Sequence, residues 1–177
     1  IFLFVAEAGA PTGFINLSGL TADNDFSSPD GLVFTPSTGL CWVQTDDGAY
    51  TDVTNCMMLA AVPGTVGDGA ATTLDYGSGT TLTTRVGKKP SAATLKRFLV
   101  GPAEQEITGL CETPDGKVLF VNVQHPGEDT LVANVGDPAK YTSHWPGNAG
   151  YGAGGANARP RPATVMVTKN DGGKVGT

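Results

Sequence analysis

The feature that most constrains this chain is a hairpin-like segment that occurs twice. Residues 30–45 read DGLVFTPSTGLCWVQT and residues 108–123 read TGLCETPDGKVLFVNV, and the two align without a gap. Each copy has an apolar run, a Thr-Pro turn with a following Gly, and a second apolar run, which is typical of a β-hairpin. The sequence therefore predicts a fold assembled from repeated antiparallel units.

A third apolar run follows each copy. After the first copy it reads CMMLAAV (residues 56–62) and after the second ATVMVTK (residues 163–169). A weaker outer strand is predicted at either 82–86 or 96–100. Four antiparallel strands per repeat are typical of a β-propeller blade. The predicted strands lie near 31–35, 40–45, 57–62, 107–112, 118–123 and 164–168.

We therefore expect an all-β fold of about two blades of a β-propeller, with long glycine-rich loops. Residues 1–177 are expected to be a single partial domain, the C-terminal part of a larger propeller. The expected first blade is 26–100, with an insertion, and the expected second blade is 104–177, with a long loop at 125–162. Propellers close with four to eight blades, so the expected partners are the remaining blades or another chain.

The sequence also suggests a conformation for two further segments. The segment SAATLKRFL (residues 91–99) could form one or two helical turns, as an alternative to the outer strand at 96–100. The opening run IFLFVAEAGAP is expected to be a strand entered in mid-domain, because it has no basic region of a signal peptide and is far shorter than the ~20 residues of a membrane span.

Composition and missing motifs exclude several classes. The chain has 25 Gly and 12 Pro, which suits a loop-rich β fold, and a net charge of -6 without a basic stripe, which argues against nucleic-acid binding. Its three cysteines match no zinc pattern. The sequence contains neither a Gly-x-Ser-x-Gly elbow nor a Gly-Lys-Ser/Thr phosphate loop, so serine hydrolases and P-loop enzymes are not expected.

Asp30 and Glu106 are the candidate metal ligands. Each lies at the start of a predicted innermost strand, and the innermost strands of a propeller line its central channel. Converging carboxylates suit Ca²⁺ and other hard cations. The alternative is that Asp30 is a turn residue and Glu106 a solvated loop charge.

Two histidines and two arginines are weaker candidates. His125 lies in His-Pro-Gly-Glu and His144 in Ser-His-Trp-Pro, where either a ligand or acid/base role or a plain turn position is possible. Arg159 and Arg161 flank Pro160 and are candidates for contacting a phosphate, or are solvated loop arginines.

Several runs resemble the PhoX-type alkaline phosphatase family. They are DFSSPDGLVFTPSTGLCWVQTD, RFLVGPAEQEITGLCETPDGKVLFVNVQHPGE, SHWP and RPRPATVMVTKNDGG. The resemblance covers most of the chain. The run FVNVQHPGE is the most specific part of it.

The resemblance implies a secreted or periplasmic phosphatase, or one in an organelle lumen, built as a propeller around Ca²⁺ and Fe³⁺ ions that hydrolyses phosphomonoesters. It implies a metal-ligand role for Asp30 first and Glu106 second, and it places a cysteine ligand of iron and several acidic ligands in an N-terminal part that this sequence lacks. Cys56 stands where the family pattern has a polar residue. The fragment alone is therefore expected to be inactive.

The sequence also allows two other functions. One is a non-catalytic propeller segment that acts as a structural or accessory subunit of a larger assembly. The other is a hydrolase resembling propeller lactonases or sugar-binding enzymes, whose motifs match less well.

Overall fold

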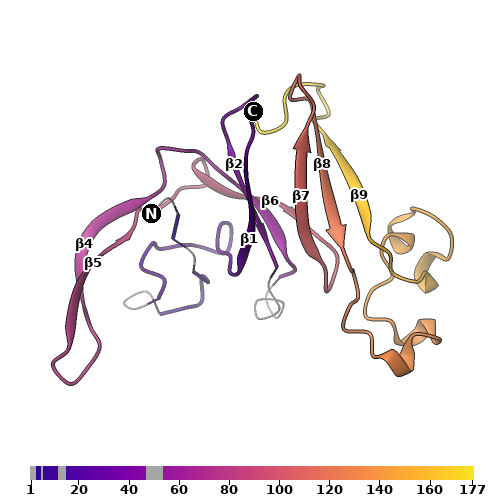
Figure 1. Cartoon of the computed structure of the whole chain (residues 1–177), viewed down its shortest axis with the longest axis horizontal. Helices are drawn as coiled ribbons and strands as arrows, with labels where there is room; N and C mark the ends of the chain where they lie inside the picture. The colour runs from indigo at the N-terminus through magenta and orange to yellow at the C-terminus, as the bar shows by residue number, and fades with distance from the viewer. Residues whose placement is uncertain (1–2, 5, 12–14, 47–53) are drawn as a thin grey trace.

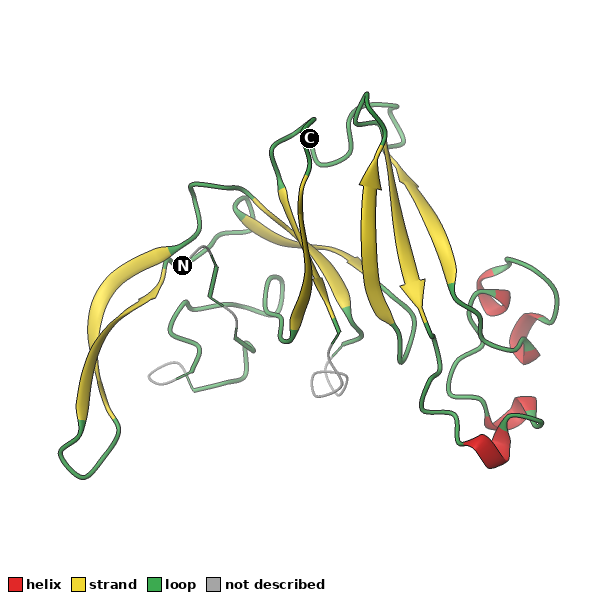
Figure 2. Cartoon of the chain, in the orientation of Figure 1, coloured by secondary structure: helices red, strands yellow, loops and turns green. Residues whose placement is uncertain are grey.

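The computed structural model describes residues 3–4, 6–11, 15–46 and 54–177, and within these it is built from β-strands without an α-helix (Figures 1 and 2). The prediction of an all-β chain is confirmed. The expected opening strand lies partly outside the described residues, and in the described part Ala6 pairs with Phe26 in an isolated bridge. No helix in the described part is long and apolar enough to cross a membrane.

The first sheet has four antiparallel strands in the order β1-β2-β3-β6: β1 (Pro29–Phe34), β2 (Cys41–Thr45), β3 (Met57–Ala61) and β6 (Leu95–Val100). The Thr-Pro turn closes the β1–β2 hairpin as predicted. The amide of Thr35 donates to the carbonyl of Leu40 at 3.0 Å. Gly39 supplies the left-handed conformation that ends the turn, with φ 71°.

The second sheet has three antiparallel strands in the order β7-β8-β9: β7 (Glu106–Glu112), β8 (Val118–Gln124) and β9 (Ala163–Thr168). Its β7–β8 hairpin repeats the first one, because the amide of Thr113 donates to the carbonyl of Val118 at 3.0 Å. The strand β9 then pairs with β8 as β3 pairs with β2.

The structure settles the choice of outer strand. Residues 96–100 belong to β6 and pair with β3, whereas residues 82–86 belong to a separate ribbon, β4 (Asp68–Asp75) with β5 (Thr81–Gly87), which projects from the body (Figure 1). This ribbon lies within the expected insertion.

The possible helical turns at 91–99 do not form, and the alternative outer strand does. Residues 92–94 form a turn and Leu95 begins β6. Leu95 is fully buried in the core and Phe98 packs edge-on against Trp42, with ring centroids 4.8 Å apart. Pairing with β3 and burial of these side chains outweigh a weak local helix propensity.

The core has two parts, one on each face of the first sheet. On one face, side chains of the sheet pack under the N-terminal segment; the buried members are Ala6, Leu20, Phe26, Cys41, Val43, Met57, Leu59, Ala61, Val66 and Leu95. On the other face they pack against the second sheet; the buried members are Trp42, Met58, Ile107, Leu119, Val121, Val123 and Val175. The two sheets are therefore stacked face to face.

Apolar side chains remain exposed on both outer faces of this stack. On β1, Leu32 is 55% exposed and Phe34 is 51% exposed, although both share a face with the first core cluster. On the far face of the second sheet, Phe120 and Met166 are cross-strand neighbours with exposures of 39% and 64%. Both outer surfaces suit contact with further sheets, while the division into blades 26–100 and 104–177 stays a prediction.

Residues 125–162 form the long loop between β8 and β9. The loop contains four short 3₁₀ turns and lies beside the end of the second sheet (Figure 2). The 3₁₀ turns are η1 (Val132–Asn134), η2 (Pro138–Lys140), η3 (Gly147–Ala149) and η4 (Gly155–Asn157).

Candidate metal-facing carboxylate site

Glu106 is the centre of the candidate site. It opens β7, opposite Gln124 at the end of β8, and its side chain is only 9% exposed. Its neighbours hold it in place: Ile107 is fully buried in the inter-sheet core, and the buried Gln105 donates to the carbonyl of Cys56 at 2.9 Å. The residues before and after Glu106 are therefore both held in place by buried contacts.

Asp30 lies beside Glu106 because of a β-bulge. Pro29 pairs with Thr45 and Gly31 with Gln44, so Asp30 is the extra residue of β1. Bulges re-aim side chains and are common next to active sites. The Asp30 side chain is within hydrogen-bonding reach of the Glu106 carboxyl group. The structure therefore brings together the two residues that the sequence singled out as metal ligands.

The electrostatics of Glu106 reflect this crowding. Its pKa is raised, first by burial, then by the negative charge of Asp46, and then by the hydrogen bond and charge of Asp30. His125 acts in the opposite direction. Burial and nearby negative charge both disfavour the ionised form of a carboxyl group, and a bound cation would favour it.

His125 joins the site from the end of β8. Its Nε2 lies 3.5 Å from Glu106 Oε2, and its Nδ1 lies 3.1 Å from Glu128 Oε2. Its backbone has φ 35°, a conformation that a non-glycine residue rarely adopts. His125 therefore lies between two carboxylates, although its buried Nδ1 has no hydrogen-bond partner within the described residues.

Backbone strain gathers around these carboxylates. Ser28 (φ 45°) precedes Asp30 by two residues, and Glu104 (φ 53°) precedes Glu106 by two. Glu104 in turn accepts hydrogen bonds from the amide of Asp129 and the hydroxyl of Thr142, which tie it to the long loop. Sparsely populated backbone conformations persist where the surrounding structure enforces them, and they cluster at functional sites.

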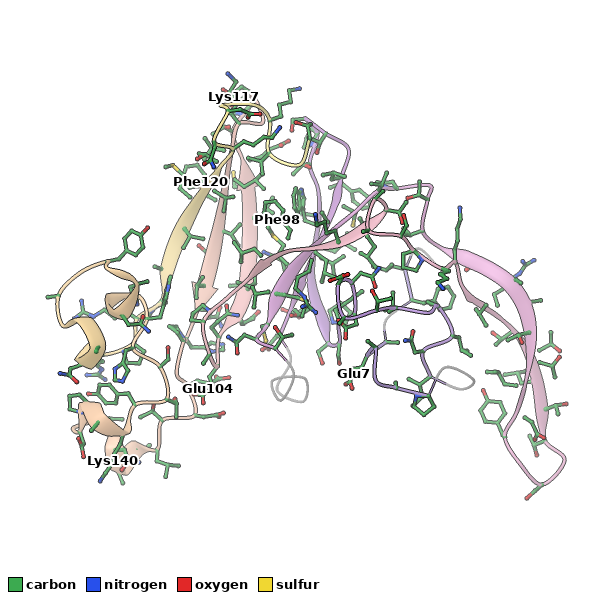
Figure 3. The ribbon with its side chains drawn as sticks, turned by 180° about the vertical axis from the view of Figure 1, so that it is seen from behind. Glu7, Phe98, Glu104, Lys117, Phe120 and Lys140 are labelled. Carbon is green, nitrogen blue, oxygen red and sulfur yellow. The ribbon has the colours of Figure 1, made fainter. Side chains whose placement is uncertain are left out.

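The site lies at one end of the sheets. Figure 3 shows Glu104, just before β7, at the opposite end of the β7–β8 pair from Lys117 in the hairpin turn. The start of β7 and the end of β8 meet at the Glu104 end. The long loop departs from the same end.

The remaining candidates lie in the long loop. His144 Nδ1 is 3.0 Å from the carbonyl of Ala158, and its ring packs near that of Tyr141. Arg159 and Arg161 are exposed. Within the described residues, no hydrogen bond or ion pair links these three side chains to Glu106, so their proposed roles stay predictions.

The carboxylates at this site are suitable ligands for a hard cation, but they are too few to bind one alone. Asp30, Glu106 and Asp46 offer carboxylate oxygens, which are the ligands that Ca²⁺ prefers. However, the described part of the chain contains no group of three or more His, Cys, Asp or Glu side chains arranged to hold a metal ion. The two ligand candidates therefore fit a site only as a contribution to a larger set.

Sequence reasoning missed Asp46 and Glu128. Asp46 directly follows β2, and its amide donates to the carbonyl of Ser28 at 3.1 Å, beside the Asp30 bulge. Asp46 could have been predicted from the sequence, because an antiparallel β1–β2 hairpin places the residue after β2 next to the start of β1. Glu128 follows His125 by three residues and is half exposed, so nothing in the pattern distinguished it from a surface charge.

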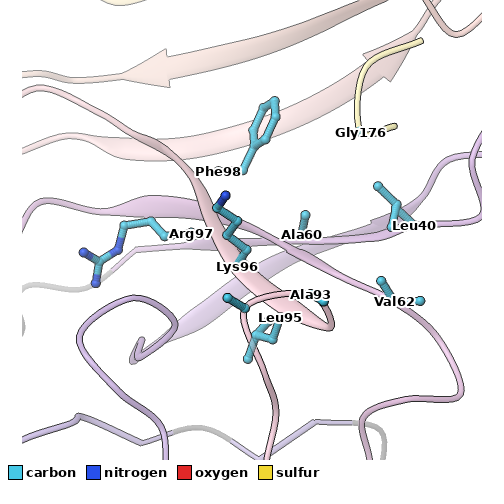
Figure 4. A pocket seen from close by; sticks show the side chains of 10 residues that line it. Leu40, Ala60, Val62, Ala93, Leu95, Lys96, Arg97, Phe98 and Gly176 are labelled. Atoms are coloured by element: carbon cyan, nitrogen blue, oxygen red, sulfur yellow. The ribbon is translucent and has the colours of Figure 1, made fainter.

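A separate hollow lies away from this cluster. It has a volume of about 350 Å³ and is lined by side chains of β3, β6 and the C-terminus, including Ala60, Lys96, Phe98 and Gly176 (Figure 4). None of the carboxylates described above lines it. The candidate metal-binding carboxylates therefore lie outside this cavity.

The stacked antiparallel sheets make this an all-β protein. The carboxylates gathered at one end of the sheets make that end a candidate site for a hard cation. The family model for alkaline phosphatase PhoX matches residues 1–127. This chain belongs to the PhoX alkaline phosphatase family.

The solved structure of Pseudomonas fluorescens PhoX in complex with vanadate, a transition state analogue, is similar to this chain. The similarity has a TM-score of 0.59 with 28% sequence identity and covers 99% of this chain. The chain spans 23% of the length of that protein. No curated protein matches it.

Proposed function

We propose that this chain is the C-terminal part of a Ca²⁺- and Fe³⁺-dependent phosphomonoesterase and that it contributes Asp30 and Glu106 to the metal site. The observation that carries the proposal is the contact between these two carboxyl groups, one on a bulge and the other buried, with Asp46 nearby. Burial and then the negative charges of Asp46 and Asp30 raise the pKa of Glu106, and a bound cation would offset both effects. Membership of the PhoX family and similarity to a vanadate-bound PhoX support phosphate chemistry.

In this proposal the residues of the chain hold and orient the site. Asp30 and Glu106 bind cations through carboxylate oxygens, and His125 positions Glu106 through its Nε2 contact. Bound metal ions supply charge that stabilises the transferring phosphoryl group. Arg159 and Arg161 stay candidates for contacting the phosphate, since the loop that carries them begins at the same end of the sheet.

The site is proposed to be incomplete within these residues. Two carboxylates are fewer than the six to eight oxygen ligands that Ca²⁺ takes. The other ligands are proposed to come from the remaining blades of the same polypeptide, packed on the exposed outer faces at Phe34 and Phe120. The blades 26–100 and 104–177 are proposed to be successive members of that ring, in a protein located in the periplasm, outside the cell or in an organelle lumen.

A second candidate is a non-catalytic propeller segment in a larger assembly. It is favoured by Cys56, which replaces a polar residue of the family pattern and is buried. Fold alone does not determine activity. The two candidates differ in whether metal is retained at Asp30 and Glu106.

The experiment that tests the proposal compares two proteins in a phosphomonoesterase assay with metal analysis. The full polypeptide should contain calcium and iron and show turnover that a chelator abolishes. Residues 1–177 alone should show no turnover above background with both metals added. A metal-free, inactive full polypeptide would favour the accessory role, and robust turnover by residues 1–177 would contradict the proposed incompleteness.

A further inference from the structure

A hollow lies beside the start of β1, between this strand and the N-terminal segment. It has a volume of about 380 Å³, within the range of small-molecule sites. Its lining residues are Ala6, Glu7, Ala10 and Ile15 of the N-terminal segment and Phe26, Ser27 and Ser28, which precede β1. Figure 3 shows Glu7 toward the same end of the sheets as Glu104 and away from Lys117. The hollow therefore lies at the end of the molecule that carries the candidate metal site.

A short run of chain joins the hollow to the first metal-ligand candidate. Phe26 and Ser28 line the hollow, and Asp30 follows Ser28 by two residues. Two residues of chain span at most about 7 Å, so the Cα atoms of Ser28 and Asp30 are no further apart than that. The carbonyl of Ser28 also accepts the amide of Asp46 at 3.1 Å, and the φ of Ser28 is 45°. The surrounding structure enforces this rare conformation, which holds the edge of the hollow next to the carboxylates.

The lining of this hollow is largely apolar. Ala6 and Phe26 are buried members of the first core cluster, so they give it a rigid apolar floor. Ile15 also lines the hollow and is 55% exposed, which leaves apolar surface available to a ligand. Among the described residues that line the hollow, Glu7 is the one charged group, so a second anionic group on a ligand is not favoured there. The hydroxyl-bearing Ser28 lies on the side nearest Asp30.

We propose that this hollow receives the organic group of the phosphomonoester and that it favours aromatic alcohols over small polar ones. The inference rests on the proposed function, because the phosphate has to be held by metal ions at Asp30. An aromatic ring attached directly to the phosphate would then lie against Phe26 and Ile15, where burial of apolar surface is favourable. A small polar alcohol would gain little from the same surface. The contact is remote from the reacting atoms, so it contributes to substrate binding.

The kinetic test compares phenyl phosphate with glycerol phosphate as substrates of the full polypeptide and of its Ile15→Ser variant. For phenyl phosphate the variant should raise KM about tenfold with kcat nearly unchanged, because it removes an apolar contact with a group that does not react. For glycerol phosphate both constants should stay nearly unchanged. The matched control is Val132→Ser, at an apolar side chain 87% exposed in the long loop, which should affect neither substrate. An equal effect of Ile15→Ser on both substrates, or no effect on either, would overturn the proposal.

Ligand binding to the chelator-treated full polypeptide gives a measurement that does not depend on activity. Phenol should shift the NMR signal of the Ile15 δ1 methyl group in a saturable way, and the signal is assigned with Ile15→Val. Glycerol at the same concentration should leave it in place. No shift with phenol would overturn the proposal even if the full polypeptide hydrolyses phenyl phosphate. A full polypeptide without turnover would contradict the proposed function instead, and the phenol shift would then decide alone whether the hollow binds aromatic groups.

Discussion

The carboxylate of Glu112, on β7, accepts two hydrogen bonds from Ser37, in the β1–β2 turn. The Ser37 amide donates to Oε1 at 2.9 Å and the hydroxyl donates to Oε2 at 2.6 Å. This bidentate contact joins the hairpin turn of one sheet to the first strand of the other. It fixes the stacking of the two sheets at the end opposite Glu106.

Replacing Glu112 by Ala should therefore destabilise the stack. Hydrogen bonds to a charged group contribute about 1.5–3 kcal/mol each, and the loss here is expected near the low end because Glu112 is only partly buried. Denaturant unfolding measures the change, with Glu7→Ala as the control at an exposed glutamate. In a double-mutant cycle, Glu112→Ala and Ser37→Ala should be strongly non-additive; additive effects would show that the contact does not form.

A second contact between the sheets depends on a glycine. Gln44 Nε2 donates to the carbonyl of Gly109 at 3.0 Å, and a Cβ at Gly31 would lie 2.5 Å from Gln44 Oε1. The Gly31→Ala variant should displace Gln44 and cost about 1–3 kcal/mol in the free energy of unfolding. Gly136→Ala, where a Cβ would meet nothing within 4 Å, should be close to neutral. Equal effects of the two variants would contradict this account.

The raised pKa of Glu106 predicts a pH effect on the metal-free protein. The folded state holds this proton more tightly than the unfolded state, whose pKa is near the ordinary value of 4.5. Stability should therefore fall as pH rises from 4.5 through the raised pKa. Glu106→Gln should remove this loss and be more stable than the wild type at neutral pH with chelator present. Denaturant unfolding across pH, with Glu7→Gln as control, tests it; an unchanged pH slope in Glu106→Gln would be evidence against the crowded carboxylates.

The three cysteines should react with a thiol reagent in a fixed order. Cys111 is exposed on the far face of the second sheet, next to Phe120, whereas Cys41 and Cys56 are buried. Burial raises the pKa of Cys41 to about 11, so its thiolate is scarce at neutral pH. In residues 1–177 alone, Cys111 should react first. In the full polypeptide it should be protected if a further sheet covers this face, and rapid labelling there would contradict that packing.

The sequence predicted the parts of the fold that depend on local chemistry. The Thr-Pro turns and following glycines located both hairpins, and the apolar runs located β3 and β9, because these signals are short-range. For residues 91–99 the sequence left a helical turn and a strand as alternatives, because the conformation of Leu95 is decided by pairing with β3 and by a core assembled from distant segments. Local propensity does not contain that information.

For the candidate site, too, local features could be predicted from the sequence and tertiary ones could not. Asp30 and Glu106 were identifiable because each lies at the start of a repeated strand. The Asp30 bulge and the contact of His125 with Glu106 were not, because they depend on strand register and on one unusual backbone angle. A pattern of residue types does not specify either of these.

The most direct test of the central claim is the calcium and iron content of the full polypeptide after Asp30→Asn. Asparagine keeps the size of the side chain and removes its charge, so folding should persist while metal affinity falls. The account predicts loss of bound metal and of phosphomonoesterase activity together, with Asp23→Asn, at an exposed aspartate, retaining both. Full metal content and turnover in the Asp30→Asn variant would contradict the assignment of Asp30 to the metal site.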